Sequence, residues 1–129
     1  MRGFNKKDFS TLDFVISCLF MQAITFDEFK EFFYLVIKKN EVEKIPIFIW
    51  DILDLKKEDI STIYNIIGFV PHSDMSASDR NAIYSIAAKR FGYLFDKNIS
   101  EENIINFLKD NPDILIRFKE TFPFIKLNF

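Results

Sequence analysis

The 129-residue sequence is poor in the residues that most often build catalytic, metal and phosphate sites. It contains only 3 glycines, one cysteine and one histidine. A single cysteine excludes an internal disulfide, and one cysteine with one histidine cannot supply the four ligands of a structural zinc site. Few glycines leave few positions that adopt a positive φ cheaply. This argues against hairpin-rich β folds and against glycine-rich loops that bind phosphate.

Neither sign of charge dominates the chain. Seventeen Lys and Arg residues stand against 19 Asp and Glu residues, for a net charge of −2. No global basic field is therefore available to hold nucleic acid or an anionic lipid surface. Hydrophobic residues are abundant, at 49%, and include 17 phenylalanines. At a mass of 15.3 kDa, this composition predicts a single helical domain over residues 1–129 with a substantial core.

No apolar run is long enough to cross a membrane. The longest, residues 14–24, is interrupted by two polar residues and falls short of the roughly 20 residues that a spanning helix needs. Residues 15–18 have the residue types of a lipoprotein cleavage site, but Asp8 and Asp13 interrupt the apolar segment that must precede such a site. Together with the free thiol, this predicts a cytoplasmic protein.

Helical periodicity and capping residues recur along the first half of the chain. Capping-box patterns at Ser10 and Thr25 precede apolar residues spaced three and four apart, which predicts helices over about residues 10–20 and 26–39. Pro46 is typical of a first helical turn and predicts a third helix to about residue 53, with a short β-strand over 45–50 as the alternative. A fourth helix is expected from Lys57 to Ile67, with Gly68 as its stop.

The second half carries residues typical of helix starts and ends: Ser76, Gly92, Ser100, Pro112 and Pro123. They predict a fifth, a sixth and a seventh helix. Residues 69–75 form the longest irregular stretch, and the apolar residues of the tail 124–129 are expected to dock on the body. The predicted fold class is therefore all-α, a single-domain helical bundle of about six or seven short helices.

No combination of residues predicts an enzyme. Cys18 falls on an apolar helical stripe, which points it into the core, and the single histidine, His72, lies in the irregular stretch. Most acidic pairs fall in predicted first helical turns, where negative charge is favourable without any catalytic role. We therefore expect no catalytic residue, no metal and no cofactor. An enzyme with an acid-only site is the third alternative, and stabilisation by magnesium or manganese would reveal it.

Asp51 and Asp54 occupy positions where the local helical structure disfavours negative charge. They lie near the end of the predicted third helix, where the helix dipole disfavours anions, and their spacing sets like charges side by side. Lys56 and Lys57 follow closely in the sequence and can offset these unfavourable interactions. Trp50, the only tryptophan, is adjacent. Residues that oppose local structure are candidates for function, whereas a solvated acidic face is the structural alternative.

Four segments carry a resemblance to a known family: LDFVISCLF (12–20), FIWDILDL (48–55), IYNIIGFVP (63–71) and AAKRFG (87–92). In its length, in the order of these segments and in their residue types, the chain resembles the small helical immunity proteins encoded beside bacterial contact-dependent growth inhibition toxins. This resemblance implies a non-enzymatic protein that binds one cognate toxin C-terminal domain, often a nuclease, and blocks it in the cytoplasm. These families share no fixed binding motif, so the resemblance assigns no functional residue.

The sequence thus predicts an immunity protein that neutralises a toxin domain by direct contact, without a nucleic-acid or membrane partner. The expected contact residues are Trp50, Asp51, Asp54, His72, Asp74 and Asp79. A monomer that binds toxin is expected, although a homodimer is possible. The alternative function is a small helical regulatory or adaptor protein, which self-associates or docks on a host protein through apolar surface that one core cannot hide.

Overall fold

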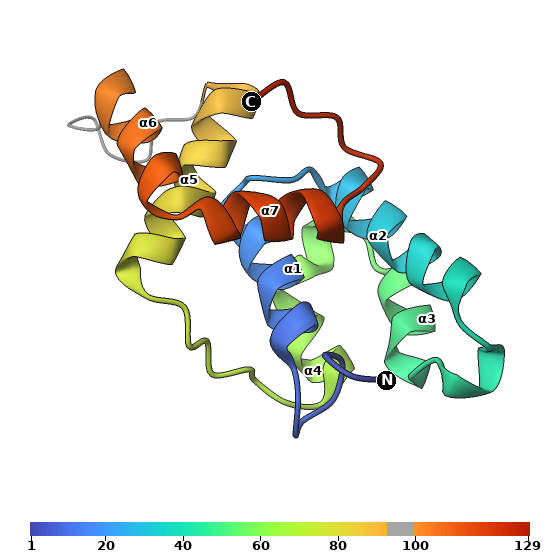
Figure 1. Ribbon diagram of the computed structural model, residues 1–129. Coiled ribbons are helices and arrows are strands. Elements are labelled where there is room, and N and C mark those ends of the chain that lie inside the picture. The colour runs from blue at the N-terminus through green and yellow to red at the C-terminus, as the bar shows by residue number, and fades with distance from the viewer. Residues whose placement is uncertain (93–99) are drawn as a thin grey trace. The chain divides into compact units, whose positions relative to one another are not determined.

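Helices make up all the regular structure of the described residues, which are 1–92 and 100–129 of this computed structural model (Figure 1). This part contains α1 (Ser10–Phe20), α2 (Phe26–Lys39), α3 (Ile47–Asp54), α4 (Ile63–Ile67), α5 (Ala77–Phe91), α6 (Glu101–Asp110) and α7 (Pro112–Thr121), with the 3-10 helices η1 (Val42–Lys44) and η2 (Lys57–Thr62). The predicted all-α fold class is confirmed. The β-strand alternative for residues 45–50 is wrong, because α3 occupies most of that segment.

The contacts within the chain divide it into two compact units. The first consists of Met1–Ile16 and Phe26–Ser73, and the second of Ser17–Thr25 and Asp74–Phe129. The first unit therefore holds α2, α3 and α4, and the second holds α5, α6 and α7, while α1 contributes residues to both. Among the helices of the described ranges, none combines the length and the apolar character needed to cross a membrane.

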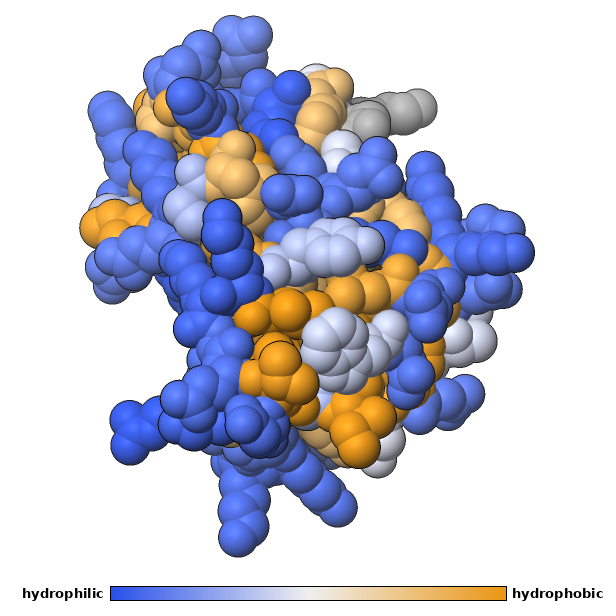
Figure 2. All heavy atoms as spheres, turned by 90° about the vertical axis from the view of Figure 1, so that its right-hand side faces the viewer, coloured by the Kyte–Doolittle hydropathy of each residue, from blue (hydrophilic) through white to orange (hydrophobic). Residues whose placement is uncertain are grey.

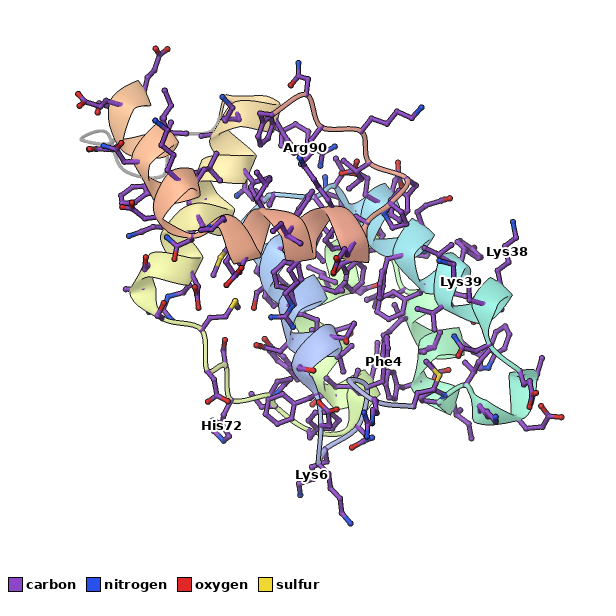
Figure 3. The ribbon with its side chains drawn as sticks, in the orientation of Figure 1. Phe4, Lys6, Lys38, Lys39, His72 and Arg90 are labelled. Carbon is purple, nitrogen blue, oxygen red and sulfur yellow. The ribbon has the colours of Figure 1, made fainter. Side chains whose placement is uncertain are left out.

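Aromatic side chains of α2 form the centre of the first unit. Phe29 and Phe33 are fully buried, with ring centroids 5.0 Å apart in an edge-to-face arrangement. Phe32 lies 5.2 Å from Phe33 and also stacks on Phe4 of the N-terminal loop, at 6.2 Å. Such pairs contribute beyond the area they bury. The predicted stripe of α2 is thus the core face of this unit, and Phe4 (labelled in Figure 3) closes it from the N-terminus.

The start of α1 differs from the predicted capping box at Ser10. Ser10 is already the first helical residue, and the cap comes from Asp8, whose carboxylate accepts hydrogen bonds from the Ser10 N–H at 3.3 Å and the Ser10 hydroxyl at 3.0 Å. These bonds favour the ionised carboxylate and lower the pKa of Asp8 below its usual 3.8. The Asp8 carboxylate thus caps the first turn of α1 from a position two residues before Ser10.

The predicted fourth helix divides into η2 and α4. Its first six residues form a 3-10 helix, and only Ile63–Ile67 are α-helical. The Thr62 hydroxyl donates to the Asp59 carbonyl at 2.7 Å, a local bond that competes with regular α-helical pairing. Gly68 ends α4 with φ 86°, as its position predicted. Burial raises the pKa of Tyr64, and the nearby Asp13 carboxylate acts in the same direction.

In the second unit, side-chain caps set the helix ends as predicted. Ser76 and Asp79 form a capping box at the start of α5, and Gly92 ends that helix with φ 74°. The Ser100 hydroxyl accepts from the Asn103 N–H at 3.2 Å and starts α6. Phe118 and Phe122 are fully buried, 4.9 Å apart. The tail docks through Ile125, which is buried, as expected for residues 124–129.

The turn that ends α1 contains a residue in the left-handed region of φ that is not glycine. Gln22 has φ 63°, the Ala23 N–H donates to the Cys18 carbonyl at 2.9 Å, and the Gln22 N–H donates to the Leu19 carbonyl at 3.0 Å. This is the hydrogen-bond pattern of a Schellman helix end, in which glycine is usual. The Arg90 guanidinium of α5 donates to the Ala23 carbonyl at 2.8 Å and holds this link in place (Figure 3).

Candidate protein-binding surface

Helix α3 separates its apolar residues between two sides. Ile49 and Ile52 are fully buried, and Leu55 directly after the helix is also buried. Ile47, Trp50, Asp51 and Asp54 recur at the complementary helical spacing, and all four are exposed. The inner stripe anchors α3 to the first unit by apolar burial. The outer stripe needs a different explanation, because it combines two large apolar side chains with two acids.

An exposed apolar surface covers this side of the first unit. It consists of Tyr34 of α2, Val42 of η1 and Ile47 and Trp50 of α3, which are 54%, 68%, 81% and 41% exposed. We call these four residues the α2–α3 face. Figure 2 views the molecule from the side on which α2 and α3 lie in Figure 1, and it shows apolar side chains gathered there and bordered by hydrophilic ones. Several exposed apolar side chains on one side of a compact unit are typical of an interaction site.

A lysine from the neighbouring helix stabilises the end of α3. The last turn of α3 contains no basic residue of its own. Instead, Lys30 of α2 donates through Nζ to the Leu53 carbonyl at 2.9 Å, and the same ammonium lies 5.2 Å from the centre of the Phe26 ring. This cation satisfies a carbonyl that the helix leaves unpaired, and it complements the negative end of the helix dipole. Lys30 therefore provides a favourable charge at this end of α3, in addition to Lys56 and Lys57, which follow the helix in the sequence.

Replacing Lys30 with methionine is expected to lower the free energy of unfolding by about 1–2 kcal/mol, because the Leu53 carbonyl loses a charged donor while the apolar stem remains. Urea denaturation measures the change. Lys38→Met is the matched control on the same helix, where the lysine is exposed and makes no bond within the described residues. Equal effects of the two substitutions would contradict a stabilising role for Lys30.

Asp51 and Asp54 have no structural role that the described residues reveal. Both are exposed, and neither carboxylate forms a hydrogen bond or ion pair with another described residue. Because Lys30 is occupied by the Leu53 carbonyl, the two carboxylates project into solvent beside Trp50 without a neutralising partner in this part of the chain. They are therefore available for charges on another molecule.

The other predicted contact residues have different settings. His72 is exposed in the irregular stretch after α4 and belongs to the first unit (Figure 3). Asp74 is exposed and belongs to the second unit. The Asp79 carboxylate accepts from the Ser76 N–H at 3.2 Å, and the Asp79 N–H donates to the Ser76 hydroxyl at 3.0 Å. Helix capping thus accounts for Asp79 locally. The structure places Trp50, Asp51 and Asp54 on the outer side of one helix, and contact roles for all six residues stay predictions.

Tyr34, Val42 and Ile47 were not among the residues predicted from the sequence, although the sequence around each of them indicates an exposed position. Tyr34 falls outside the apolar stripe of α2, so its aromatic ring faces solvent. Val42 is the single apolar residue between the charged residues Glu41 and Glu43. Ile47 precedes Trp50 by three residues, which sets both on one helical face. An apolar residue outside a core stripe is the sign that would have identified them.

The side chains considered for catalysis do not add to this surface. Cys18 is fully buried, as its place on the apolar stripe of α1 predicted. Over residues 1–92 and 100–129, no group of three or more His, Cys, Asp and Glu side chains is arranged to hold a metal ion. The feature that the fold defines in the first unit is thus an exposed apolar surface bordered by charges.

Comparisons with models of protein families, with curated protein sequences and with solved structures found no match for this chain.

Proposed function

We propose that this protein is a bacterial immunity protein, which binds a cognate toxin domain in the cytoplasm and neutralises it by direct contact. The observation that carries the proposal is the outer stripe of α3, where Trp50 and Ile47 are exposed next to two unneutralised carboxylates. Tryptophan and tyrosine are enriched among the residues that dominate binding energy at protein interfaces. The resemblance of four segments to toxin-immunity proteins supports the same conclusion.

The charges on α3 indicate how the toxin is recognised. A toxin that cleaves nucleic acid has to approach phosphates, and a basic surface on it would attract Asp51 and Asp54. Opposite charges on two partners accelerate their encounter and fix their orientation. The Trp50 indole then supplies apolar burial at the centre of the contact, where displaced water strengthens the neighbouring ion pairs. No chemical step by this protein is needed for inhibition.

The test is binding to candidate toxin C-terminal domains, beginning with that of any exported protein that the upstream gene encodes. The double variant Asp51→Lys/Asp54→Lys is expected to slow association with that domain by at least about tenfold, because steering attraction becomes repulsion. Stopped-flow or surface-plasmon-resonance kinetics measure the rate. The expected effect is smaller at high salt, since screening weakens both attraction and repulsion.

A matched control separates a local effect from one of net charge. Asp110→Lys/Glu120→Lys makes the same change in charge at exposed residues of α6 and α7 in the second unit, and it should leave association nearly unchanged. Failure of the wild-type chain to bind the toxin domain would contradict the proposed function. Equal slowing by both double variants would contradict only the assignment of α3 as the contact surface.

A further inference from the structure

Helix α3 contains few groups that would hold it in a helical conformation by itself. It is 8 residues long, its N-cap residue Pro46 makes no side-chain cap, and its last turn has no basic residue. A helix this short is marginal in water, so most of its stability has to come from tertiary contacts. The conformation of α3, and with it the geometry of its outer stripe, therefore depends on the rest of the first unit.

Two kinds of contact hold α3 in the first unit. The buried side chains Ile49 and Ile52 contribute apolar burial, which stabilises the helix but is not directional. The hydrogen bond from the Lys30 ammonium to the Leu53 carbonyl is directional, and among the described residues it is the one hydrogen bond that joins a side chain to α3. Lys30 is half-buried and lies against the Phe26 ring, so this donor is itself held in place.

The Leu53 carbonyl belongs to the turn of α3 that carries the proposed contact residues. Trp50 precedes Leu53 by one helical turn, and Asp54 follows it directly. We infer that Lys30 is a positioning residue for toxin binding, because its bond to Leu53 fixes this last turn. Trp50, Asp51 and Asp54 then meet a toxin domain in one preformed arrangement, so that binding costs less ordering. This inference rests on the proposed function.

The first experiment measures the mobility of the turn without any toxin domain. Trp50 is the only tryptophan of the chain, so the fluorescence anisotropy decay of the full chain reports on this turn alone. Lys30→Met is expected to increase the amplitude of the fast local motion of Trp50 by at least about twofold. Lys30→Arg keeps the charge and an N–H donor for the carbonyl, so it should retain the wild-type decay.

Two control variants separate positioning from a general loss of stability. Lys38→Met removes a lysine of the same helix that makes no bond within the described residues. Ser100→Ala removes the side-chain cap of α6 in the second unit, so it destabilises the fold without changing α3. Both controls should leave the Trp50 decay unchanged.

The second experiment measures binding kinetics with the toxin domain that the test above identifies. Lys30→Met removes a cation from the end of α3 that carries the two carboxylates, so association with a basic toxin surface should be at least as fast as in the wild type. Dissociation should be at least about fivefold faster, because the loosened turn has to be ordered in the complex. Lys30→Arg should restore dissociation to within about twofold of the wild type. An effect of charge alone cannot produce this division between the two rates.

Several outcomes would overturn the inference. They are a Trp50 decay that Lys30→Met leaves unchanged, an equal change in that decay in Ser100→Ala, and failure of Lys30→Arg to restore the wild-type behaviour. Circular dichroism verifies that Lys30→Met is folded, which is expected because the apolar stem of the side chain remains. Toxin dissociation that Lys30→Met leaves unchanged would overturn the inference and keep the proposed function. A wild-type chain that binds no toxin domain would contradict the proposed function, and the Trp50 decay would then decide alone whether Lys30 positions α3.

Discussion

Replacing Phe33 with alanine is expected to lower the free energy of unfolding by about 3–5 kcal/mol, the largest effect among the substitutions considered. Phe33 is fully buried, and its ring lies 5.0 Å from that of Phe29 and 5.2 Å from that of Phe32. Truncation removes the apolar burial of the ring and leaves a cavity that two neighbouring rings cannot fill by small shifts. Urea denaturation followed by circular dichroism measures the loss.

The same substitution at an exposed phenylalanine provides the comparison. Phe20, the last residue of α1, is 45% exposed, and Phe20→Ala is expected to cost no more than about 1 kcal/mol, as is usual for partly solvated positions. A cost at Phe33 as small as that at Phe20 would contradict the aromatic core described for the first unit.

Gly3→Ala is expected to destabilise the protein by about 3 kcal/mol, because it combines an unfavourable backbone conformation with a steric overlap. Gly3 has φ 85° and is buried, and its carbonyl accepts from the Leu12 N–H at 2.9 Å. A Cβ at this position would overlap the Thr11 side chain, with Thr11 Cβ only 2.7 Å away. The overlap would push the N-terminal loop away from the start of α1.

The same substitution at Gly68 separates the cost of the backbone conformation from the cost of the steric overlap. Its φ is 86°, almost the same as that of Gly3, but a Cβ there would meet nothing within 4 Å. Gly68→Ala should therefore cost only the left-handed backbone, about 1 kcal/mol. Thermal or urea unfolding of both variants gives the comparison. Equal losses would show that contact with Thr11 contributes nothing and that backbone conformation alone sets the cost.

Most of the helix boundaries could be predicted because their causes are local. Ser76, Ser100 and Gly92 act on backbone groups no more than four residues away, so sequence spacing contains the information. The exceptions have local causes that the sequence pattern left ambiguous. At the start of α1, the Asp8 carboxylate accepts a hydrogen bond from the Ser10 N–H, which the pattern at Ser10 did not predict. At Thr62, the hydroxyl pairs with a carbonyl three residues earlier, within a 3-10 turn.

The candidate surface could be predicted only in part. Trp50, Asp51 and Asp54 stood out because anions near a helix end oppose the local dipole, and all three lie on the outer side of α3. Their connection to α2 was not predictable, because Lys30 and Leu53 are 23 residues apart in the chain. Nothing in the spacing of either helix indicates that a lysine of one would reach a carbonyl of the other.

The sequence by itself determined that this protein is helical, where most helices start and end, and which aromatic residues of α2 are buried, because capping and periodicity act over a few residues. Only the tertiary structure decided which apolar residues stay outside. Packing α3 on α2 buries one side of each helix and leaves Tyr34, Ile47 and Trp50 exposed in the same unit. It also gives Lys30 the role of capping α3, and it leaves the two carboxylates of that helix exposed to solvent.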